Sequence, residues 1–388
     1  MAEWTKFDMP GPDNGAHGSQ SDYIYGIDLV RFASATGVAA FHLNESAITR
    51  ALTVPFGWIG VEVFFVISGL VIANSARGAS QRQFVVHRFL RLYPAAWCAA
   101  IVNLPLFLWY FGKHSRWFLS LSQSILLVHF PRGNFLAGAY WTLPVEFSFY
   151  FLVFVMIRVK RFERIQWLAI FLILWSAPYS LALVLNCWGV VHWPWVDIGF
   201  GLPNMLLFRH GLYFGLGILV WLFKEKQIER VGVLAGGLAL VLGIMEIYGR
   251  TVEYFPDFAR GGYAPHAFWH NLANWAVFAF YSGFAAILIS VRFNHLFPAN
   301  AAVRRIVRSL GLMTYPFYLM HERVGGYVTN QMSRVGLDPL LCALASFICL
   351  GTISLFIASY CEPALRGFLR RNFGVLNPAM QQEASPVP

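Results

Sequence analysis

Charged residues are scarce in this chain, and their scarcity excludes an ordinary soluble protein. Asp, Glu, Lys and Arg make up 12% of the 388 residues, against about 25% in typical soluble domains. Hydrophobic residues account for 57% of the sequence, and the mean hydropathy is +0.55. Because long apolar runs recur along the whole sequence, it predicts an all-α, polytopic integral membrane protein.

Cysteine is also rare, and its placement excludes the usual metal and redox motifs. No CxxC pair or Cys/His cluster occurs, and most of the five cysteines fall in apolar segments. We interpret them as small buried hydrophobic residues and predict no metal site.

Internal repeats and low-complexity linkers are absent as well, which favours a single domain. We assign residues 22–362 to this transmembrane domain, between a polar segment (1–21) and a cytoplasmic tail (363–388). The polar segment lacks the basic start and short apolar core of a signal peptide, so we expect the first helix to remain in the mature protein.

Ten apolar segments are long enough to cross a bilayer. They are residues 24–43, 57–75, 92–111, 140–158, 165–187, 204–223, 231–248, 268–291, 309–328 and 340–361. An eleventh run, 117–130, is short and contains His129, so we expect it to be re-entrant or interfacial.

The distribution of Lys and Arg over the loops predicts the orientation. With the N-terminus in the cytoplasm, 19 of the 29 basic residues fall on the cytoplasmic side. The positive-inside rule therefore favours about ten transmembrane helices with both termini in the cytoplasm. The net charge of +10 is scattered over several loops, which indicates contact with anionic membrane lipid and no nucleic-acid partner.

The first apolar segment carries two ionisable residues, Arg31 and His42, eleven positions apart. Eleven helical steps come to within about 20° of three turns, so both side chains project from one face, about 16 Å apart along the axis. Asp28 is close enough to Arg31 to pair with it. Ionisable groups are costly in a membrane, which makes this face a candidate functional site; an interfacial His42 and a snorkelling Arg31 are the alternative.

The second segment and the stretch that follows it add a carboxylate, two serines and two arginines. Glu62 lies near the outer end of the second segment, where Ser68 and Ser75 share one face, a spacing that also suits helix packing. Arg88 and Arg91 lie in the cytoplasmic stretch between the second and third segments, where they present two guanidinium groups on one side of a helix. Such a pair suits phosphate or pyrophosphate recognition, and a membrane-boundary anchor is the alternative.

The fourth and ninth segments carry further polar residues toward the outer side. Trp141 stands at the start of the fourth segment, Glu146 lies deeper, and Tyr150 shares the face of Glu146. A carboxylate at this depth is either a buried structural group or part of an active site. In the ninth segment, His321 and Glu322 also fall toward the outer side.

Five runs in order resemble the motifs of the acyltransferase family 3 membrane proteins, O-acyltransferases that modify bacterial surface polysaccharides. The runs are Arg31…His42 as R-x10-H, Phe64–Ser75 as FFxISGxxxxxS, Arg88…Arg91 as RxxR, Trp141–Tyr150 as W[ST]LxxExxFY and Tyr315–His321 as YxxYLxH. Some relatives carry a second, soluble hydrolase-like domain after the last helix. We expect that its contribution to acceptor handling is absent here or supplied by another protein.

The resemblance implies an acyl-CoA donor, usually acetyl-CoA, a carbohydrate hydroxyl as acceptor, and a location in the bacterial inner membrane. It also implies that Arg88 and Arg91 hold the CoA phosphates. The residues that we expect to contact the substrates are Trp141, Tyr150, His321, Ser68 and Ser75.

Acyl transfer from a thioester to an alcohol needs a base for the hydroxyl proton and donors for the developing oxyanion. We expect His42 to be the base, because imidazole titrates near neutral pH. Glu146 or Glu62 is expected to support it, with Glu146 preferred, and Arg31 to guide the thioester or polarise its carbonyl. An acetyl-histidine intermediate is the competing version of direct transfer.

A transporter or flippase of lipid-linked saccharides is the alternative function. Ten helices with buried ionisable residues also suit a translocation pathway. The RxxR pair and the lack of recognisable inverted repeats favour the enzyme. A non-catalytic membrane scaffold would leave the buried His and Arg without a purpose.

Overall fold

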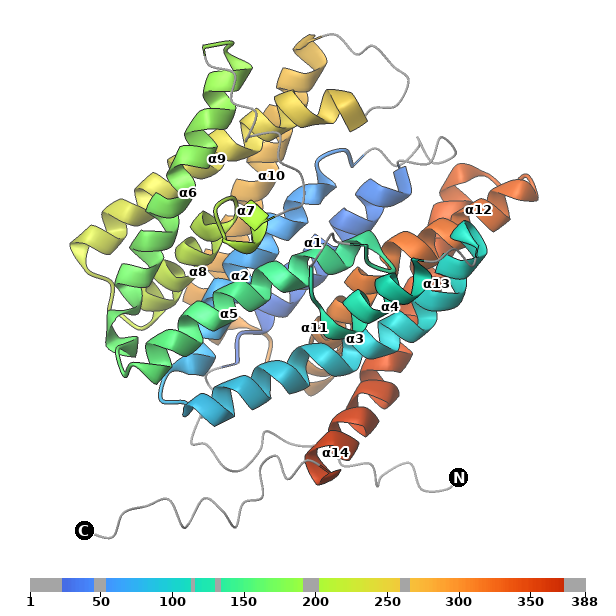
Figure 1. The fold of residues 1–388 in the computed structure, drawn as a ribbon, viewed down its shortest axis with the longest axis horizontal. Coiled ribbons are helices and arrows are strands. Elements are labelled where there is room, and N and C mark those ends of the chain that lie inside the picture. The colour runs from blue at the N-terminus through green and yellow to red at the C-terminus, as the bar shows by residue number, and fades with distance from the viewer. Residues whose placement is uncertain are drawn as a thin grey trace.

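In the computed structural model, the chain is described over residues 23–44, 54–112, 116–129, 134–190, 202–258 and 266–372. Within these ranges every regular element is helical, and no strand is present. The long helices form a bundle, from which α14 (Glu362–Asn372) projects at the lower end of Figure 1. The predicted all-α class is therefore confirmed.

The other helices follow one another with mostly short connections. They are α1 (Tyr25–Asn44), α2 (Gly60–Ala76), α3 (Gln81–Phe111), α4 (Trp117–Leu126), α5 (Thr142–Arg158), α6 (Ile165–Cys187), α7 (Leu202–Met205), α8 (Gly211–Lys224), α9 (Arg230–Phe258), α10 (His266–Arg292), α11 (Ala301–Met320), α12 (Gly326–Arg334) and α13 (Pro339–Phe356). Short 3₁₀ turns, Gly57–Ile59 and Gly138–Trp141, precede α2 and α5. Two π-helical segments, η6 (His321–Gly325) and η7 (Ile357–Cys361), follow α11 and α13.

Several helices are suited to cross a membrane. Within the described ranges, seven helical segments are long and apolar enough: Gly57–Ala76, Gln81–Phe111, Gly138–Arg158, Phe162–Cys187, Arg230–Val252, Phe268–Arg292 and Pro339–Asn372. Helix α8 is apolar but shorter, whereas α1 and α11 contain charged residues. The protein is an integral membrane protein; the count of ten spans and the cytoplasmic termini stay predictions.

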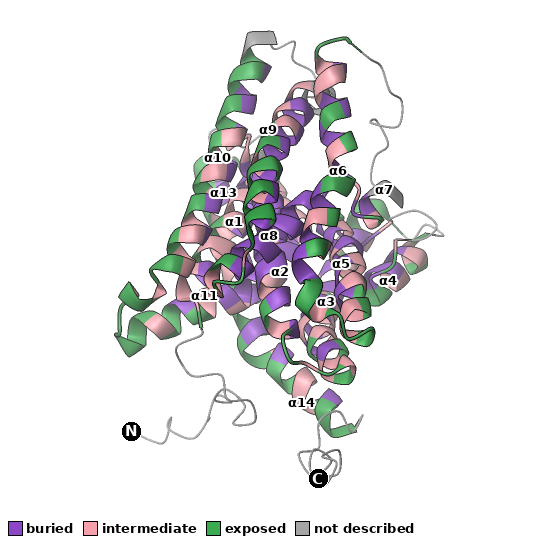
Figure 2. Ribbon diagram, turned by 90° about the vertical axis from the view of Figure 1, so that its left-hand side faces the viewer, coloured by how far each residue is buried: buried purple, intermediate pink, exposed green. Residues whose placement is uncertain are grey.

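Many large apolar residues are exposed, and Figure 2 shows the exposed positions in green on the outward sides of the helices. Examples from different helices are Ile101, Phe171, Leu234, Phe278 and Ile348, each more than half exposed. In water such a surface would cause aggregation, whereas lipid tails solvate it. The exposed apolar faces thus agree with the composition.

Helix α4 corresponds to the eleventh apolar run. It has ten residues, about 15 Å of helix, which is too short to cross a hydrocarbon core of about 30 Å. It packs against α3, and its polar side chains hold the chain before α5. Gln123 accepts a hydrogen bond from the Asn134 amide at 2.8 Å, and Ser124 accepts one from the Leu136 amide at 2.9 Å.

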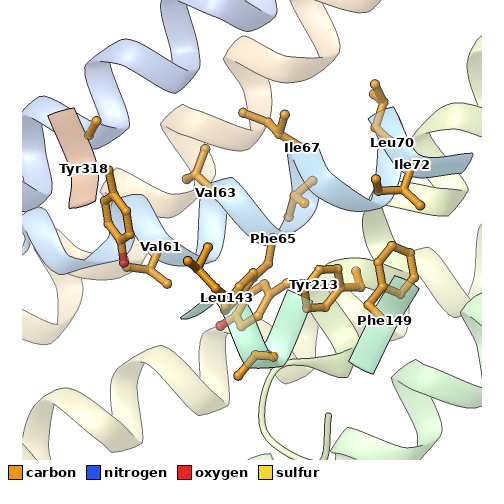
Figure 3. Close-up of a cluster of buried hydrophobic side chains, with 14 of the residues drawn as sticks. Val61, Val63, Phe65, Ile67, Leu70, Ile72, Leu143, Phe149, Tyr213 and Tyr318 are labelled. Carbon is orange, nitrogen blue, oxygen red and sulfur yellow. The ribbon is translucent and has the colours of Figure 1, made fainter. Parts of the chain in front are cut away.

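Helix α2 lies at the centre of the bundle and packs against α1, α5, α8 and α10. Its sequence is apolar on all sides, which is typical of a helix buried all round. Figure 3 shows Val61, Phe65 and Ile67 of α2 among Leu143 and Tyr213 from neighbouring helices. Most of α2 and α8 is buried (Figure 2).

Two glycines allow α2 and α8 to approach closely. A Cβ atom on Gly217 would overlap the backbone carbonyl oxygen of Val66, and one on Gly69 would overlap that of Phe214. Small residues let helix backbones meet in this way inside membranes. Gly69 belongs to the FFxISG run, so the packing interpretation of that run accounts for the glycine.

Candidate active site

The C-terminal end of α1 meets the π-helical segment η6, and this contact brings two histidines and a carboxylate together. His42 Nε2 lies 3.9 Å from Glu322 Oε1. The imidazole rings of His42 and His321 have centroids 5.0 Å apart. His321 is buried, whereas the side chains of His42 and Glu322 are 30% and 24% exposed. The cluster is therefore partly accessible.

Backbone groups fix this cluster in place. The Gly138 amide, just before α5, donates a hydrogen bond to Glu322. The Tyr318 carbonyl can only accept, so His321 donates to it from Nδ1 at 2.5 Å. Arg323 donates to the Leu136 carbonyl at 2.7 Å. Single π-helical turns are frequent at functional sites, and η6, which carries His321 and Glu322, is such a turn.

An inner cavity of about 90 Å³ begins near this cluster and continues toward the opposite end of the bundle. Thr142 and Tyr318 line it on the side of the cluster, and the Tyr318 ring lies 5.5 Å from that of His321. Its polar lining also includes Arg31, Ser68, Arg88, Arg91, Glu146 and Tyr150. One carboxylate thus shares a small cavity with three arginines.

The carboxylate of Glu146 is held by two hydroxyl groups. Ser68 donates to it at 2.9 Å, and Tyr150 donates at 2.6 Å. The guanidinium of Arg88 lies over the Tyr150 ring at 5.8 Å and over the Phe84 ring at 5.9 Å. These contacts bring together side chains from the FFxISGxxxxxS, RxxR and W[ST]LxxExxFY runs.

A second, larger cavity adjoins the inner one, and we refer to it as the mouth cavity. Its volume is about 310 Å³, and it shares Arg31, Val71 and Arg91 with the inner cavity. It lies among the N-terminal part of α1, the first half of α11 and the C-terminal ends of α2 and α8, where Lys224 and Arg308 line it. The two cavities together run from a basic mouth toward the histidine cluster.

The structure brings most of the expected site residues together, with three exceptions. Ser75 donates to the Ile72 carbonyl of its own helix at 3.1 Å and lines neither cavity. Trp141 lies outside the inner cavity, with its ring 5.5 Å from that of buried His210. Glu62 is 1% exposed and forms an ion pair with Arg250, which also lies 3.3 Å from Glu246.

The position of the supporting carboxylate needs a correction. We expected Glu146 or Glu62 beside His42, but the structure engages these groups with Ser68 and Arg250. The carboxylate beside His42 is Glu322. In the sequence, Glu322 directly follows His321 at the end of the YxxYLxH run, and this was the only sign of a further carboxylate near the site. Its position beside His42 became clear only from the packing of η6 against α1.

Two imidazoles and a carboxylate also form a possible ligand set for a cation. One ligand atom from each of His42, His321 and Glu322 lies within 4.8 Å of the others. In this position the same three groups can exchange a proton with a bound hydroxyl. The absence of a metal site stays a prediction from the sequence.

Fold and site together define a polytopic helical membrane protein with two adjoining cavities, the inner of which reaches Tyr318 beside the histidine and carboxylate cluster. Residues 24–361 match the model of the acyltransferase domain family, Acyl_transf_3. The chain belongs to this family, so the resemblance seen in its five motifs is confirmed.

Curated relatives support the same family. The protein is 27% identical over 346 residues to YrhL of Bacillus subtilis (strain 168), whose name describes a peptidoglycan O-acetyltransferase; the match covers 78% of this chain and 48% of YrhL. It is 26% identical over 214 residues to the O-acetyl transferase of Shigella phage Sf6, covering 51% and 61% of the two chains. It is 27% identical over 210 residues to BcsY of Komagataeibacter xylinus, named for a membrane-bound transacylase, covering 48% and 51%.

The chain thus spans about half the length of the curated relatives that it matches. No solved structure matches it significantly.

Proposed function

We propose that the protein transfers an acyl group, with acetyl expected, from acyl-CoA to a hydroxyl of a saccharide at the outer side of the bacterial inner membrane. The observation that carries this proposal is the pair of adjoining cavities. They share Arg31 and Arg91, begin at a basic mouth and lead to Tyr318, which contacts His321. A cytoplasmic anionic donor and an external acceptor require such a path.

The saccharide acceptor rests on the relatives. One of them is named for O-acetyl transfer and another for O-acetyl transfer to peptidoglycan. Membership of the acyltransferase family supports acyl transfer. The orientation rests on the positive-inside rule, which places the mouth cavity on the cytoplasmic side and His42 on the outer side.

In the proposed reaction, His42 accepts the proton of the acceptor hydroxyl, and the hydroxyl oxygen attacks the carbonyl carbon of the thioester. The new C–O bond forms, the C–S bond breaks, and the CoA thiolate leaves and takes up the proton. Glu322 stabilises the imidazolium and is itself oriented by the Gly138 amide, as a carboxylate does in a catalytic triad. Tyr318 offers a hydroxyl donor for the oxyanion, whereas the Thr142 hydroxyl donates to the Ala139 carbonyl at 3.1 Å.

The experiment is acetyl transfer by purified protein in lipid nanodiscs. Labelled acetyl-CoA is supplied with surface polysaccharide extracted from the source cell, and label in the glycan and free thiol are both measured. We expect transfer by the wild-type chain and none by His42→Ala. A His42→Ala protein that transfers acetyl at the wild-type rate would contradict the role of His42.

The same preparation separates the alternatives. Saccharide movement across the membrane without thiol release would indicate the transporter or flippase. Rapid-quench labelling tests whether an acetyl-histidine forms: label on His42 supports the two-step version, and its absence during steady turnover supports direct transfer.

A further inference from the structure

The mouth cavity has a strongly basic lining that the RxxR pair alone does not provide. Its charged lining residues are Arg31, Arg91, Lys224 and Arg308, against Asp28 as the single acid among them. Asp28 is 7% exposed and accepts a hydrogen bond from Tyr23. The cavity therefore carries an excess of positive charge, and its size of about 310 Å³ lies within the range of small-molecule sites.

The two arginines of the RxxR run divide between the cavities. Arg88 lines only the inner cavity, where it stacks on Phe84 and Tyr150. Arg91 lines both cavities. An anion in the mouth cavity would thus meet Arg91 together with basic groups from other helices.

Lys224 is held at the edge of the mouth cavity by an acidic neighbour. It donates to Glu225 at 2.7 Å, and Arg77 donates to the same carboxylate at 2.6 Å. Partial burial opposes ionisation of Glu225, but the hydrogen bonds from Lys224 and Arg77 outweigh it and hold the pKa of this carboxyl below its ordinary value. Glu225 is therefore charged at neutral pH, and it orients Lys224 while offsetting part of its charge.

An aromatic wall completes the mouth cavity. Trp221 lines it and is 2% exposed. Its indole nitrogen donates to Asn74 at 3.2 Å, and Asn74 also lines the cavity. Fixed aromatic and amide groups beside four basic groups suit a phosphorylated nucleoside better than a simple inorganic anion.

We propose that the mouth cavity binds the phosphates at the nucleotide end of the acyl-CoA donor through Lys224 and Arg308, together with Arg31 and Arg91. The proposal rests on the proposed function. On this proposal, the mouth cavity binds acyl-CoA more tightly than acylated pantetheine, because acylated pantetheine lacks the nucleotide phosphates. Guanidinium groups bind phosphate oxygens in pairs, and charge-assisted hydrogen bonds of this kind are strong.

The first test compares two donors, acetyl-CoA and S-acetylpantetheine, in nanodiscs of phosphatidylcholine. We expect Arg308→Gln and Lys224→Gln each to raise the KM for acetyl-CoA about tenfold, with kcat and the KM for S-acetylpantetheine nearly unchanged. The matched controls are Arg305→Gln and Lys226→Gln, because both residues are exposed and line neither cavity. Equal effects on both donors, or none on acetyl-CoA, would overturn the proposal.

A third variant should act in the opposite direction. Glu225→Gln removes the negative charge that offsets Lys224, so we expect the KM for acetyl-CoA to fall about twofold to threefold. A rise in this KM that equals the rise for Lys224→Gln would count against an anion site at Lys224.

The second test measures binding alone, with adenosine 3′,5′-bisphosphate as the probe. We expect calorimetry to show binding to the wild-type protein and about tenfold weaker binding to Arg308→Gln. Nanodiscs with and without phosphatidylglycerol distinguish the nucleotide from a lipid headgroup. If Arg308→Gln changes only the retention of phosphatidylglycerol, the cavity is a lipid site and the proposal fails.

The two tests separate this proposal from the proposed function. Bisphosphate binding that depends on Arg308, without turnover of either thioester, would support the nucleotide site and contradict acyl transfer. Turnover of both thioesters with equal KM values would support acyl transfer and contradict the nucleotide site.

Discussion

Glu322 Oε1 lies 3.9 Å from His42 Nε2, although the two residues come from opposite ends of the chain. The Gly138 amide bonds to the same carboxylate, so three distant segments meet at one point. A Cβ atom on Gly138 would overlap the Glu322 carboxylate. Any larger residue at this position would therefore shift the Glu322 carboxylate away from its bond with the amide.

Neutralising Glu322 should reduce catalysis more than substrate binding. We expect Glu322→Gln to lower kcat on the order of 100-fold, because an unsupported imidazole accepts a proton less well. The measurement is steady-state acetyl transfer in nanodiscs. Glu163→Gln, on the exposed turn before α6, serves as the control, and a wild-type kcat for Glu322→Gln would remove this residue from the mechanism.

Glu146→Gln tests the carboxylate that the sequence favoured. Because Ser68 and Tyr150 already engage Glu146, we expect a loss in kcat of less than about tenfold. A loss as large as that of Glu322→Gln, measured in the same assay, would return the supporting role to Glu146.

Removing Arg250 should destabilise the fold. Arg250→Met leaves Glu62 buried without its ion-pair partner, and such a loss costs about 3–5 kcal/mol. Thermal unfolding in detergent measures the change, with exposed Arg158→Met as the control. Replacing Glu62 by Met as well should recover part of the stability, and no difference between Arg250→Met and the control would refute the prediction.

Closer packing at the contact between α2 and α8 should also be unfavourable. Gly217→Ala places a methyl group against the Val66 carbonyl, and overpacking of this kind costs about 1–3 kcal/mol. Gly237→Ala on α9 is the matched control, since a Cβ atom there meets nothing within 4 Å. Unfolding temperatures that fall equally for both variants would show that the close approach is not responsible.

Local patterns predicted the helices and several contacts of the site. Helical spacing predicts that Arg31 and His42 share one face, and in the structure Arg31 lines both cavities. A spacing of seven residues places Ser68 and Ser75 on one face, but it does not show that Ser68 bonds to Glu146 while Ser75 bonds to its own helix.

Long-range partners could not be derived from the sequence. Glu62 and Arg250 are far apart in the chain, and no local pattern pairs them. The same holds for Lys224 and Arg308, which appear in the sequence as ordinary loop charges and meet in the mouth cavity only through helix packing. Periodicity identifies the face of a helix, whereas partner choice depends on how the helices are arranged.

The unequal size of the two cavities has a consequence for the membrane itself. The mouth cavity has a volume of about 310 Å³, whereas the inner cavity, which three arginines line, has a volume of about 90 Å³. The positive charge of these arginines attracts anions and disfavours the entry of cations. If the proposed acyl transfer uses these cavities, the same arginines that attract its anionic donor would oppose a leak of cations along the path.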